Sequence, residues 1–229
     1  MLEHLREEVL EANLELVRRG LVLYTFGNAS GISREDGLVV IKPTGVPYEA
    51  MTPRDLVVTD LEGRVVEGSL KPSTDLATHR SLYRAFPAIG GVVHTHSTHA
   101  TAWAQARREM PCFGTTHADY FRGAVPVTDE LTAAEIDADY EWNTGQAIVR
   151  RLTGLDPSET RAVLVAGHGP FTWGNSATEA SHNSVVLEEL ARIAFYTVAI
   201  NANASPLPDV WRDKHFLRKH GAGAYYGQK

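Results

Sequence analysis

The sequence predicts an α/β fold, in which one mixed domain has a largely antiparallel sheet covered by helices on both faces. The chain has 229 residues, the length of one ordinary or large domain, and contains no linker, internal repeat or low-complexity segment. Short β-rich runs joined by short turns fill residues 21–70, and connections this short favour antiparallel pairing. From residue 71 onward, strand and helix patterns alternate.

The first part of the chain begins with an expected amphipathic helix over residues 2–18, where apolar residues recur at helical spacing between Glu and Arg. Gly20 should end this helix. Four β-rich runs then predict strands. These runs are LVLYTF (21–26), GLVVIK (37–42), DLVVTD (55–60) and RVVEG (64–68).

The second part begins with a predicted helix over residues 76–86, whose N-terminus should be capped by the polar residues before it. GGVVHTHS (90–97) reads as a buried strand that runs into a helix. The remaining expected elements are a helix over 98–108, a turn-rich stretch over 112–126, a helix over Glu135–Leu152, an apolar strand ending at Gly167, a helix from a capping box at Ser176 and Glu179 to about Ile200, and a helix over Asp209–His220.

Composition and charge argue against several classes of protein. Lysine plus arginine is 22 and aspartate plus glutamate is 28, so the net charge is −6, which does not suit a nucleic-acid binder with a basic face. No run approaches the ~20 apolar residues of a membrane span, and the charged N-terminus is unlike a signal peptide. The single cysteine, Cys112, fits a reducing compartment. We therefore expect a soluble cytoplasmic protein.

The sharpest chemical signal is a pair of histidines at the end of the strand in GGVVHTHS. Side chains alternate along a strand, so His94 and His96 should project from the same face and could grip one metal ion. Taken alone, two histidines on an exposed strand face explain the pair equally well. His168 follows a second apolar strand and Asp75 lies at a predicted helix start. Three imidazoles and a carboxylate suit zinc, with manganese or cobalt as substitutes.

Four small polar clusters stand at expected turns and are candidates for phosphate binding. They are residues 27–30, 42–45, 71–74 and 114–116. Each cluster alone is typical of an ordinary turn, so a site requires the fold to bring them together. Neither a Walker A nor a G-x-G-x-x-G pattern is present, and a nucleotide-binding fold is not indicated.

Long blocks of the sequence resemble the class II aldolase/adducin family, and within it the sugar-phosphate 4-epimerases. The blocks are GNAS (27–30), IKPTGV (41–46), KPSTDLATHRSLYRAFPAIGGVVHTHS (71–97), GTTHADYFRG (114–123), HGPFTWG (168–174) and DKHFLRKHGAGAYYGQ (213–228). The resemblance runs end to end. It implies one domain over residues 1–229, a three-layer α/β/α sandwich, and a homotetramer with active sites at the subunit interfaces.

The resemblance also assigns roles to residues. It implies one Zn²⁺ per subunit, with Mn²⁺ or Co²⁺ as substitutes, held by Asp75, His94, His96 and His168. Substrate contacts carry over to Gly27, Asn28, Lys42, Thr44, Gly45, Ser73 and Thr74. The catalytic acid/base pair carries over to Asp119 and Tyr226, with His215 and Arg218 in support. From the residues alone, Asp119 could equally form a turn, and Tyr226 lies near the end of the chain, where disorder is the default.

The activity that the resemblance implies is a metal-dependent interconversion of L-ribulose 5-phosphate and D-xylulose 5-phosphate, as in L-arabinose catabolism. It would proceed by retro-aldol cleavage of the C3–C4 bond and re-addition. Thr44 and Thr74 stand where the family has serine, and both keep the hydroxyl.

Several alternatives stay open at the level of sequence. One is a class II aldolase acting on a substrate such as L-fuculose 1-phosphate, although such enzymes carry glutamate at the position of Asp75. A second is a sister 4-epimerase acting on another pentulose phosphate. A third is a non-catalytic domain of the adducin type, which would be expected to lack the histidines. A fourth is a (β/α)₈ metal-dependent hydrolase, which residues 21–70 do not fit.

Overall fold

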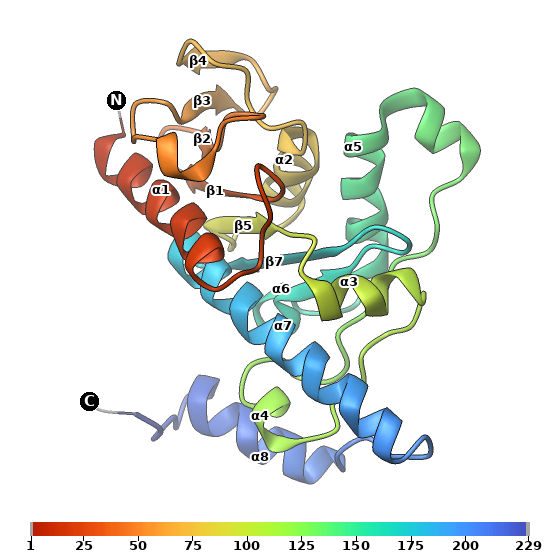
Figure 1. Cartoon of the computed structure of the whole chain (residues 1–229). Helices are drawn as coiled ribbons and strands as arrows, with labels where there is room; N and C mark the ends of the chain where they lie inside the picture. The colour runs from red at the N-terminus through yellow and green to blue at the C-terminus, as the bar shows by residue number, and fades with distance from the viewer. Residues whose placement is uncertain (1, 228–229) are drawn as a thin grey trace.

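A seven-stranded sheet forms the centre of the computed structural model, which describes residues 2–227 (Figure 1). The strands are β1 (Asn28–Ser33), β2 (Leu38–Ile41), β3 (Val57–Asp60), β4 (Val65–Glu67), β5 (Gly91–His94), β6 (Ala162–Leu164) and β7 (Pro170–Gly174). Their order is β4-β3-β2-β1-β5-β7-β6, and every neighbouring pair is antiparallel. The predicted antiparallel sheet is therefore confirmed.

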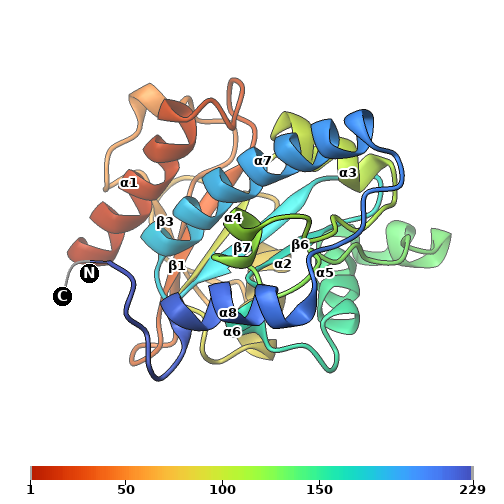
Figure 2. The same cartoon turned by 90° about the horizontal axis from the view of Figure 1, so that it is seen from below.

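Helices cover both faces of this sheet. One face carries α1 (Glu3–Arg18) and α7 (Ala177–Ile200), and the other carries α2 (Leu76–Ala85) and α5 (Ala133–Arg151) (Figures 1 and 2). The remaining helical segments are η1 (Tyr48–Ala50), α3 (Thr98–Gln105), α4 (Thr115–Ala118), α6 (Pro157–Thr160) and α8 (Asp209–His220). The architecture is the expected three-layer α/β/α sandwich. Within residues 2–227 the structure has no helix of the length and apolarity that crossing a membrane requires.

The inner strands supply both layers of the core. Val39 and Ile41 of β2 pack with α2 and α5, whereas Val40 between them packs with α1 and α7. Val92 and Val93 of β5 divide in the same way. Both faces of these strands are buried, which is why they read as uninterrupted apolar runs rather than as an alternating pattern.

The predicted strand at residues 21–26 is wrong. That segment is a loop in which the exposed Tyr24 adopts a left-handed conformation with φ of 52°. The strand is instead β1, in the polar GNAS sequence that we expected at a turn. A Cβ on Gly31 of β1 would lie only 2.8 Å from Leu5, so glycine here lets α1 pack closely. Apolar periodicity does not reveal a strand whose residues are small because a helix packs closely against them.

Three smaller expectations also differ from the structure. The single strand predicted to end at Gly167 is a hairpin of β6 and β7, with His168 in its turn. The turn-rich stretch at 112–126 contains the short helix α4. At the start of α2, the N-cap residue Asp75 makes no side-chain capping bond. Of the polar residues predicted to cap this helix, Ser73 accepts a hydrogen bond of 3.4 Å from the Asp75 N–H, just before the first helical residue. The predicted helices themselves are confirmed to within a few residues.

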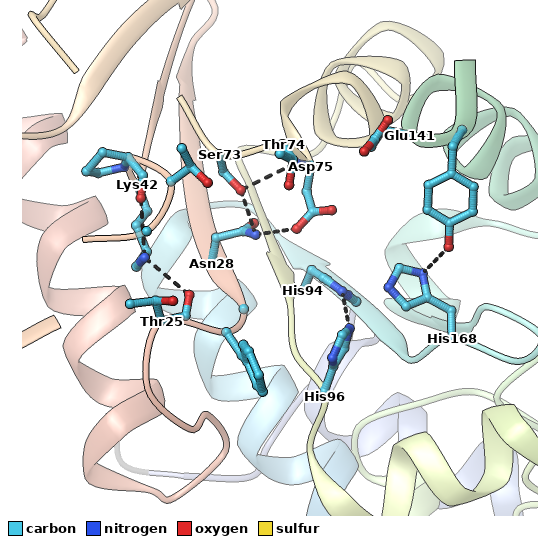
Figure 3. Close-up of a pocket in the computed structure, with 16 residues that line it drawn as sticks. Thr25, Asn28, Lys42, Ser73, Thr74, Asp75, His94, His96, Glu141 and His168 are labelled. Atoms are coloured by element: carbon cyan, nitrogen blue, oxygen red, sulfur yellow. Dashed lines mark hydrogen bonds between the residues drawn. The ribbon is translucent and has the colours of Figure 1, made fainter. Parts of the chain in front are cut away.

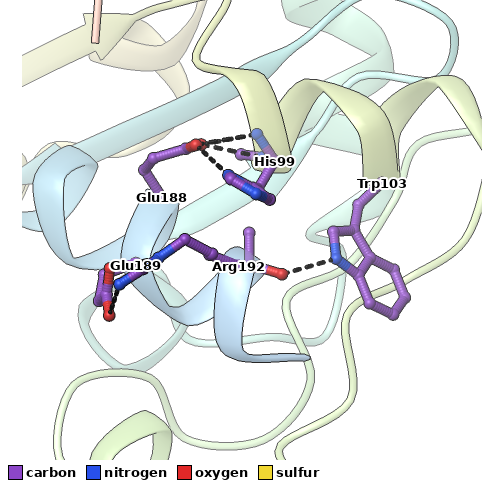
Figure 4. A network of polar contacts seen from close by, with 7 residues as sticks. His99, Trp103, Glu188, Glu189 and Arg192 are labelled. Carbon is purple, nitrogen blue, oxygen red and sulfur yellow. Dashed lines mark hydrogen bonds and ion pairs between the residues drawn. The ribbon is translucent and has the colours of Figure 1, made fainter. Parts of the chain in front are cut away.

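The start of α3 is anchored to α7 by a partly buried polar network (Figure 4). The Glu188 carboxylate accepts hydrogen bonds from the backbone N–H groups of His99 and Ala100 and from Nδ1 of His99. The Trp103 indole donates to the carbonyl oxygen of Ala191 at 3.1 Å. An anionic group at a helix N-terminus satisfies N–H groups that have no partner inside the helix. This network fixes the chain immediately after the histidine pair.

Candidate active site

A pocket of about 370 Å³ lies beside α2 and α5, where β1 begins and β2 and β5 end (Figure 3). All the residues predicted as metal ligands or substrate contacts line it. They are Gly27, Asn28, Lys42, Thr44, Gly45, Ser73, Thr74, Asp75, His94, His96 and His168. The sheet explains part of this convergence, because Asn28 pairs with His94 in the register of β1 and β5.

Three imidazoles meet at one end of the pocket. The ligand nitrogens of His94, His96 and His168 all lie within 4.8 Å of one another, and Nε2 of His94 is 3.0 Å from Nε2 of His96. Nδ1 of His94 donates to the carbonyl oxygen of Pro170 at 2.9 Å. Since a neutral imidazole has one N–H, this bond leaves the Nε2 lone pair of His94 free toward the other two rings.

The protonation states of these rings also suit a metal. Burial lowers the pKa of His168 to about 4, and the neighbouring His94 and His96 act in the same direction. Burial likewise lowers the pKa of His96. The two rings are therefore neutral near neutral pH, and neutral imidazole is the form that binds a metal. Three imidazole nitrogens around one small volume fit a divalent ion such as zinc.

Asp75 lies in the same pocket but outside the three-histidine group. Its Oδ2 accepts a hydrogen bond of 2.6 Å from the amide of Asn28. Burial raises the pKa of the Asp75 carboxyl, but His94, His79 and Asn28 together outweigh this and hold the pKa below its ordinary value. The carboxylate is therefore ionised beside the histidines, and its role as a fourth metal ligand stays a prediction.

Two turns lie side by side at the other end of the pocket. The Thr44 N–H donates to the carbonyl oxygen of Lys71 at 3.0 Å, and the Ser73 N–H donates to that of Lys42 at 2.9 Å. These bonds bring the clusters at 42–45 and 71–74 next to the start of β1, as a phosphate site requires. The fourth cluster, 114–116, lines a different cavity and does not join them.

Lys42 is the cation of this end and is only 1% exposed. Its Nζ lies 3.4 Å from the carbonyl oxygen of Thr25 and 4.7 Å from the ring centre of Tyr48. Burial lowers the pKa of Lys42 to about 8. Within residues 2–227 no carboxylate lies within ion-pair distance of this ammonium. A buried cation without a carboxylate partner suits an anionic ligand.

Gly27 stands between the two ends and has no room for a side chain. Its φ is 72°, and a Cβ would lie 2.9 Å from the carbonyl oxygen of His94 and 2.9 Å from Val22. Both the positive φ and the close approach of the His94 carbonyl oxygen therefore require glycine at this position.

The predicted acid/base residues gather in a second cluster, away from the pocket. Asp119 follows α4 and receives two hydrogen bonds from Arg218 at 3.0 and 2.8 Å and one from Nδ1 of His215 at 3.1 Å. Burial raises the pKa of Asp119, but Arg218, His215 and Lys219 hold it below its ordinary value. The Tyr226 ring lies 5.0 Å from the Arg218 guanidinium. None of these residues lines the pocket, and Figure 1 shows α4 and α8 below the sheet.

Sequence reasoning missed four residues that line the pocket, and gave no individual role to Pro43, which lies inside the predicted cluster 42–45. The four are Thr25, Phe26, Tyr140 and Glu141. Thr25 and Phe26 directly precede the GNAS block, so nearness in sequence could have found them. Tyr140 and Glu141 come from α5, where the backbone leaves helical geometry at Asp139. Helical periodicity gives no signal for a residue that a kink turns toward a site.

Comparison with known proteins places the chain in a family. Residues 7–195 match the family described as Class II Aldolase and Adducin N-terminal domain. The chain is 53% identical over 228 residues to proteins named L-ribulose-5-phosphate 4-epimerase UlaF from Salmonella paratyphi A and Salmonella typhi. Each match covers 100% of this chain and 100% of the Salmonella protein.

Solved structures agree with this placement. An L-fuculose 1-phosphate aldolase is 28% identical, with a TM-score of 0.76 over 93% of this chain and 94% of its own. The L-fuculose-1-phosphate aldolase from Thermus thermophilus is 26% identical, with a TM-score of 0.68 over 89% of this chain and 98% of its own. The pocket that sequence motifs predicted thus sits on a shared fold, and the chain belongs to the class II aldolase and adducin family.

Proposed function

We propose that the protein is a metal-dependent 4-epimerase that interconverts L-ribulose 5-phosphate and D-xylulose 5-phosphate. The observation that carries this proposal is that one pocket has three histidines that could hold a metal ion at one end and a buried lysine among hydroxyl-bearing turns at the other. A phosphorylated sugar presents a carbonyl and a phosphate at opposite ends. The full-length identity of 53% to proteins with the epimerase name supports the same choice.

The metal end would hold one Zn²⁺ per subunit, with Mn²⁺ or Co²⁺ as substitutes. His94, His96 and His168 would be the ligands, with Asp75 completing the set. When bound, a divalent ion supplies a Lewis acid that polarises a substrate carbonyl and stabilises the negative charge that develops there.

The phosphate end would anchor the substrate through Lys42, the hydroxyls of Thr44, Ser73 and Thr74, and the backbone around Gly45. Gly27 and Asn28 would contact the substrate between the two ends. An arriving phosphate dianion favours the protonated form of Lys42, because opposite charges at close range raise the pKa of an ammonium group. Anchoring matters because the reaction must not lose its fragments.

Inversion at C4 needs more than an anchor. The hydrogen on C4 is not adjacent to the carbonyl, so simple deprotonation there is unfavourable. Cleavage of the C3–C4 bond instead leaves an aldehyde that still carries the phosphate, and re-addition to its opposite face inverts the centre. This requires one proton-transfer group on each face of the aldehyde. We assign these roles to Asp119 and Tyr226, supported by His215 and Arg218.

These residues do not line the pocket of their own chain, so they would come from a neighbouring subunit. The proposal therefore includes a homotetramer with active sites at the subunit interfaces. It also includes a place in L-arabinose catabolism in the cytoplasm, on the strength of the resemblance.

Product analysis tests the proposal directly. The protein is loaded with Zn²⁺, and in parallel with Mn²⁺, then given L-ribulose 5-phosphate and followed by carbon NMR. We expect D-xylulose 5-phosphate to appear and a chelator to suppress it. Accumulation of dihydroxyacetone and glycolaldehyde phosphate would instead indicate an aldolase, the activity named for the structural neighbours. No turnover with either metal would overturn the proposal.

A further inference from the structure

We infer that Tyr140 is a positioning residue for the metal site, because its hydroxyl holds the imidazole of His168 in the tautomer that directs Nε2 toward the other two histidines. The phenolic oxygen of Tyr140 lies 3.3 Å from Nδ1 of His168, the contact drawn as a dashed line to His168 in Figure 3. The inference rests on the proposed metal site and does not depend on which sugar phosphate is the substrate.

His168 needs such a partner more than His94 does. His94 ends a central strand, and the carbonyl oxygen of Pro170 already fixes its Nδ1. His168 lies in the turn between β6 and β7, after Gly167 with its φ of 74°. Within residues 2–227 the Tyr140 hydroxyl is the one hydrogen-bond partner of the His168 ring. Without it, the ring could rotate or adopt the other tautomer.

The chemistry of the pair fits this role. A neutral histidine that offers Nε2 to a cation carries its hydrogen on Nδ1. The phenolic oxygen of Tyr140 can accept that hydrogen and still donate its own into the pocket, which its ring lines. Partners of this kind fix the orientation of a ligand ring, and their loss typically weakens metal binding ~10–100-fold.

Hydrogen bonds to two successive backbone carbonyl oxygens hold Tyr140 in place. The kink in α5 lies at Asp139, with φ of −144° and ψ of 85°. The carbonyl oxygen of Tyr140 accepts a hydrogen bond from Thr144 at 2.8 Å, and that of Glu141 accepts one from Thr78 of α2 at 2.5 Å. The kink therefore has partners inside α5 and in the neighbouring helix, so it presents the Tyr140 ring from a fixed support.

The test is a Co²⁺ affinity titration of the full chain, with the visible absorption of bound Co²⁺ as a second readout. Tyr140→Phe removes the hydroxyl and keeps the ring. Tyr120→Phe is the matched control, because the Tyr120 hydroxyl lies 3.4 Å from Nε2 of His182 in a pair that does not line the pocket. We expect Tyr140→Phe to weaken Co²⁺ binding ~10–100-fold and alter the spectrum, and Tyr120→Phe to change neither.

Two results would count against the inference, and they differ. Wild-type Co²⁺ affinity and spectrum in Tyr140→Phe would overturn the positioning role and leave the metal site standing. Failure of the unmodified chain to bind Co²⁺ would overturn the metal site, and the proposed function with it.

Discussion

The pocket lined by the three histidines and Lys42 and the cluster around Asp119 are built in different ways. In the pocket, several key groups are held by bonds to backbone carbonyl oxygens, as in the bonds from His94 to Pro170 and from Ser73 to Lys42, although His96 itself is exposed. In the Asp119 cluster, charged side chains from α8 hold one carboxylate, and Tyr226 is 60% exposed. The first region is positioned by backbone bonds around the sheet, and the second by ion pairs to the Asp119 carboxylate, whose residue is only 8% exposed.

This difference divides the proposed reaction into two parts. The proposed metal ligands and phosphate contacts all line one pocket of a single chain. The Asp119 cluster contains the proposed proton-transfer groups, but it lies away from the pocket of its own chain. Binding should therefore depend on the pocket alone, whereas turnover should depend on both regions and on the contact between subunits.

The largest effect should follow from removing one imidazole. His96→Ala removes one of the proposed metal ligands. Losing a residue that only hydrogen-bonds to a ligand typically weakens metal binding by up to ~100-fold, so Co²⁺ affinity should fall by more than that. Turnover should be lost with it. Affinity is measured by competition with a chelator, and His4→Ala on the exposed face of α1 is the control. Normal metal binding in His96→Ala would mean that the three histidines are not the site.

The next effect should separate turnover from binding. Tyr226→Phe removes one proposed proton-transfer group, and general acid–base catalysis contributes ~10²–10⁴-fold, so turnover should fall within that range. Co²⁺ affinity should not change, because Tyr226 does not line the pocket. The control is Tyr225→Phe, which alters a neighbouring tyrosine of nearly equal exposure, 59%. Equal losses in the two variants would remove Tyr226 from the reaction.

Mixing two inactive variants would show whether the regions meet between subunits. Lys42→Met damages the pocket and Tyr226→Phe damages the tail. If each site joins the pocket of one chain with the tail of the next, random mixed tetramers should regain on the order of a quarter of wild-type turnover. Activity is measured after the variants are unfolded and refolded together. No recovery would place the pocket and the tail of one site in the same chain.

The same two regions show how far the sequence could lead. The sequence predicted the histidine pair from the two-residue period of a strand. In the structure β5 ends at His94 and His96 lies just beyond it, but the two Nε2 atoms still lie 3.0 Å apart. The clusters at 27–30, 42–45 and 71–74 were predicted as parts, but their meeting depends on the sheet order, which no local pattern encodes. The sequence signal for Asp119 and Tyr226 came from a family resemblance, since neither residue type has a distinctive spacing.

What escaped prediction depends on tertiary packing. The strand expected at residues 21–26 has the right composition, but β1 is selected by the close approach of α1 to Gly31. The place of Tyr140 depends on a kink that is stabilised by Thr144 and Thr78. Both features follow from contacts between distant segments, and short-range periodicity cannot register them.

A smaller effect should appear in the pH dependence of phosphate binding. The pKa of Lys42 is lowered to about 8 by burial, and only the protonated ammonium attracts an anion. The Kd for inorganic phosphate should therefore rise as pH increases through about 8, as measured by titration calorimetry at several pH values. In Lys42→Met the binding should be weak and independent of pH over that range. A flat profile in the unmodified chain would show that Lys42 is not the phosphate cation.

The linked stability change has the opposite direction. Between about 8 and the ordinary value of 10.5, the unfolded chain binds a proton on Lys42 that the folded chain has released. Folded-state stability contributed by this group therefore increases with pH across that window and is constant below it. Above a pH of about 8, phosphate affinity should thus fall while the stability of the unmodified chain rises. Lys42→Met should abolish both changes.

The smallest effect should come from Ser73→Ala. The Ser73 hydroxyl accepts a hydrogen bond of 3.0 Å from Asn28, and it lines the proposed phosphate end. A hydrogen bond to a charged ligand contributes ~1.5 kcal/mol, so KM should rise about tenfold while kcat changes little. Ser33→Ala is the control, because Ser33 lies at the far end of β1, outside the pocket, and its hydroxyl donates to Asp36 nearby. A fall in kcat at unchanged KM would instead place Ser73 next to the reacting carbons, and the division between an anchoring pocket and a distant proton-transfer cluster would need to be redrawn.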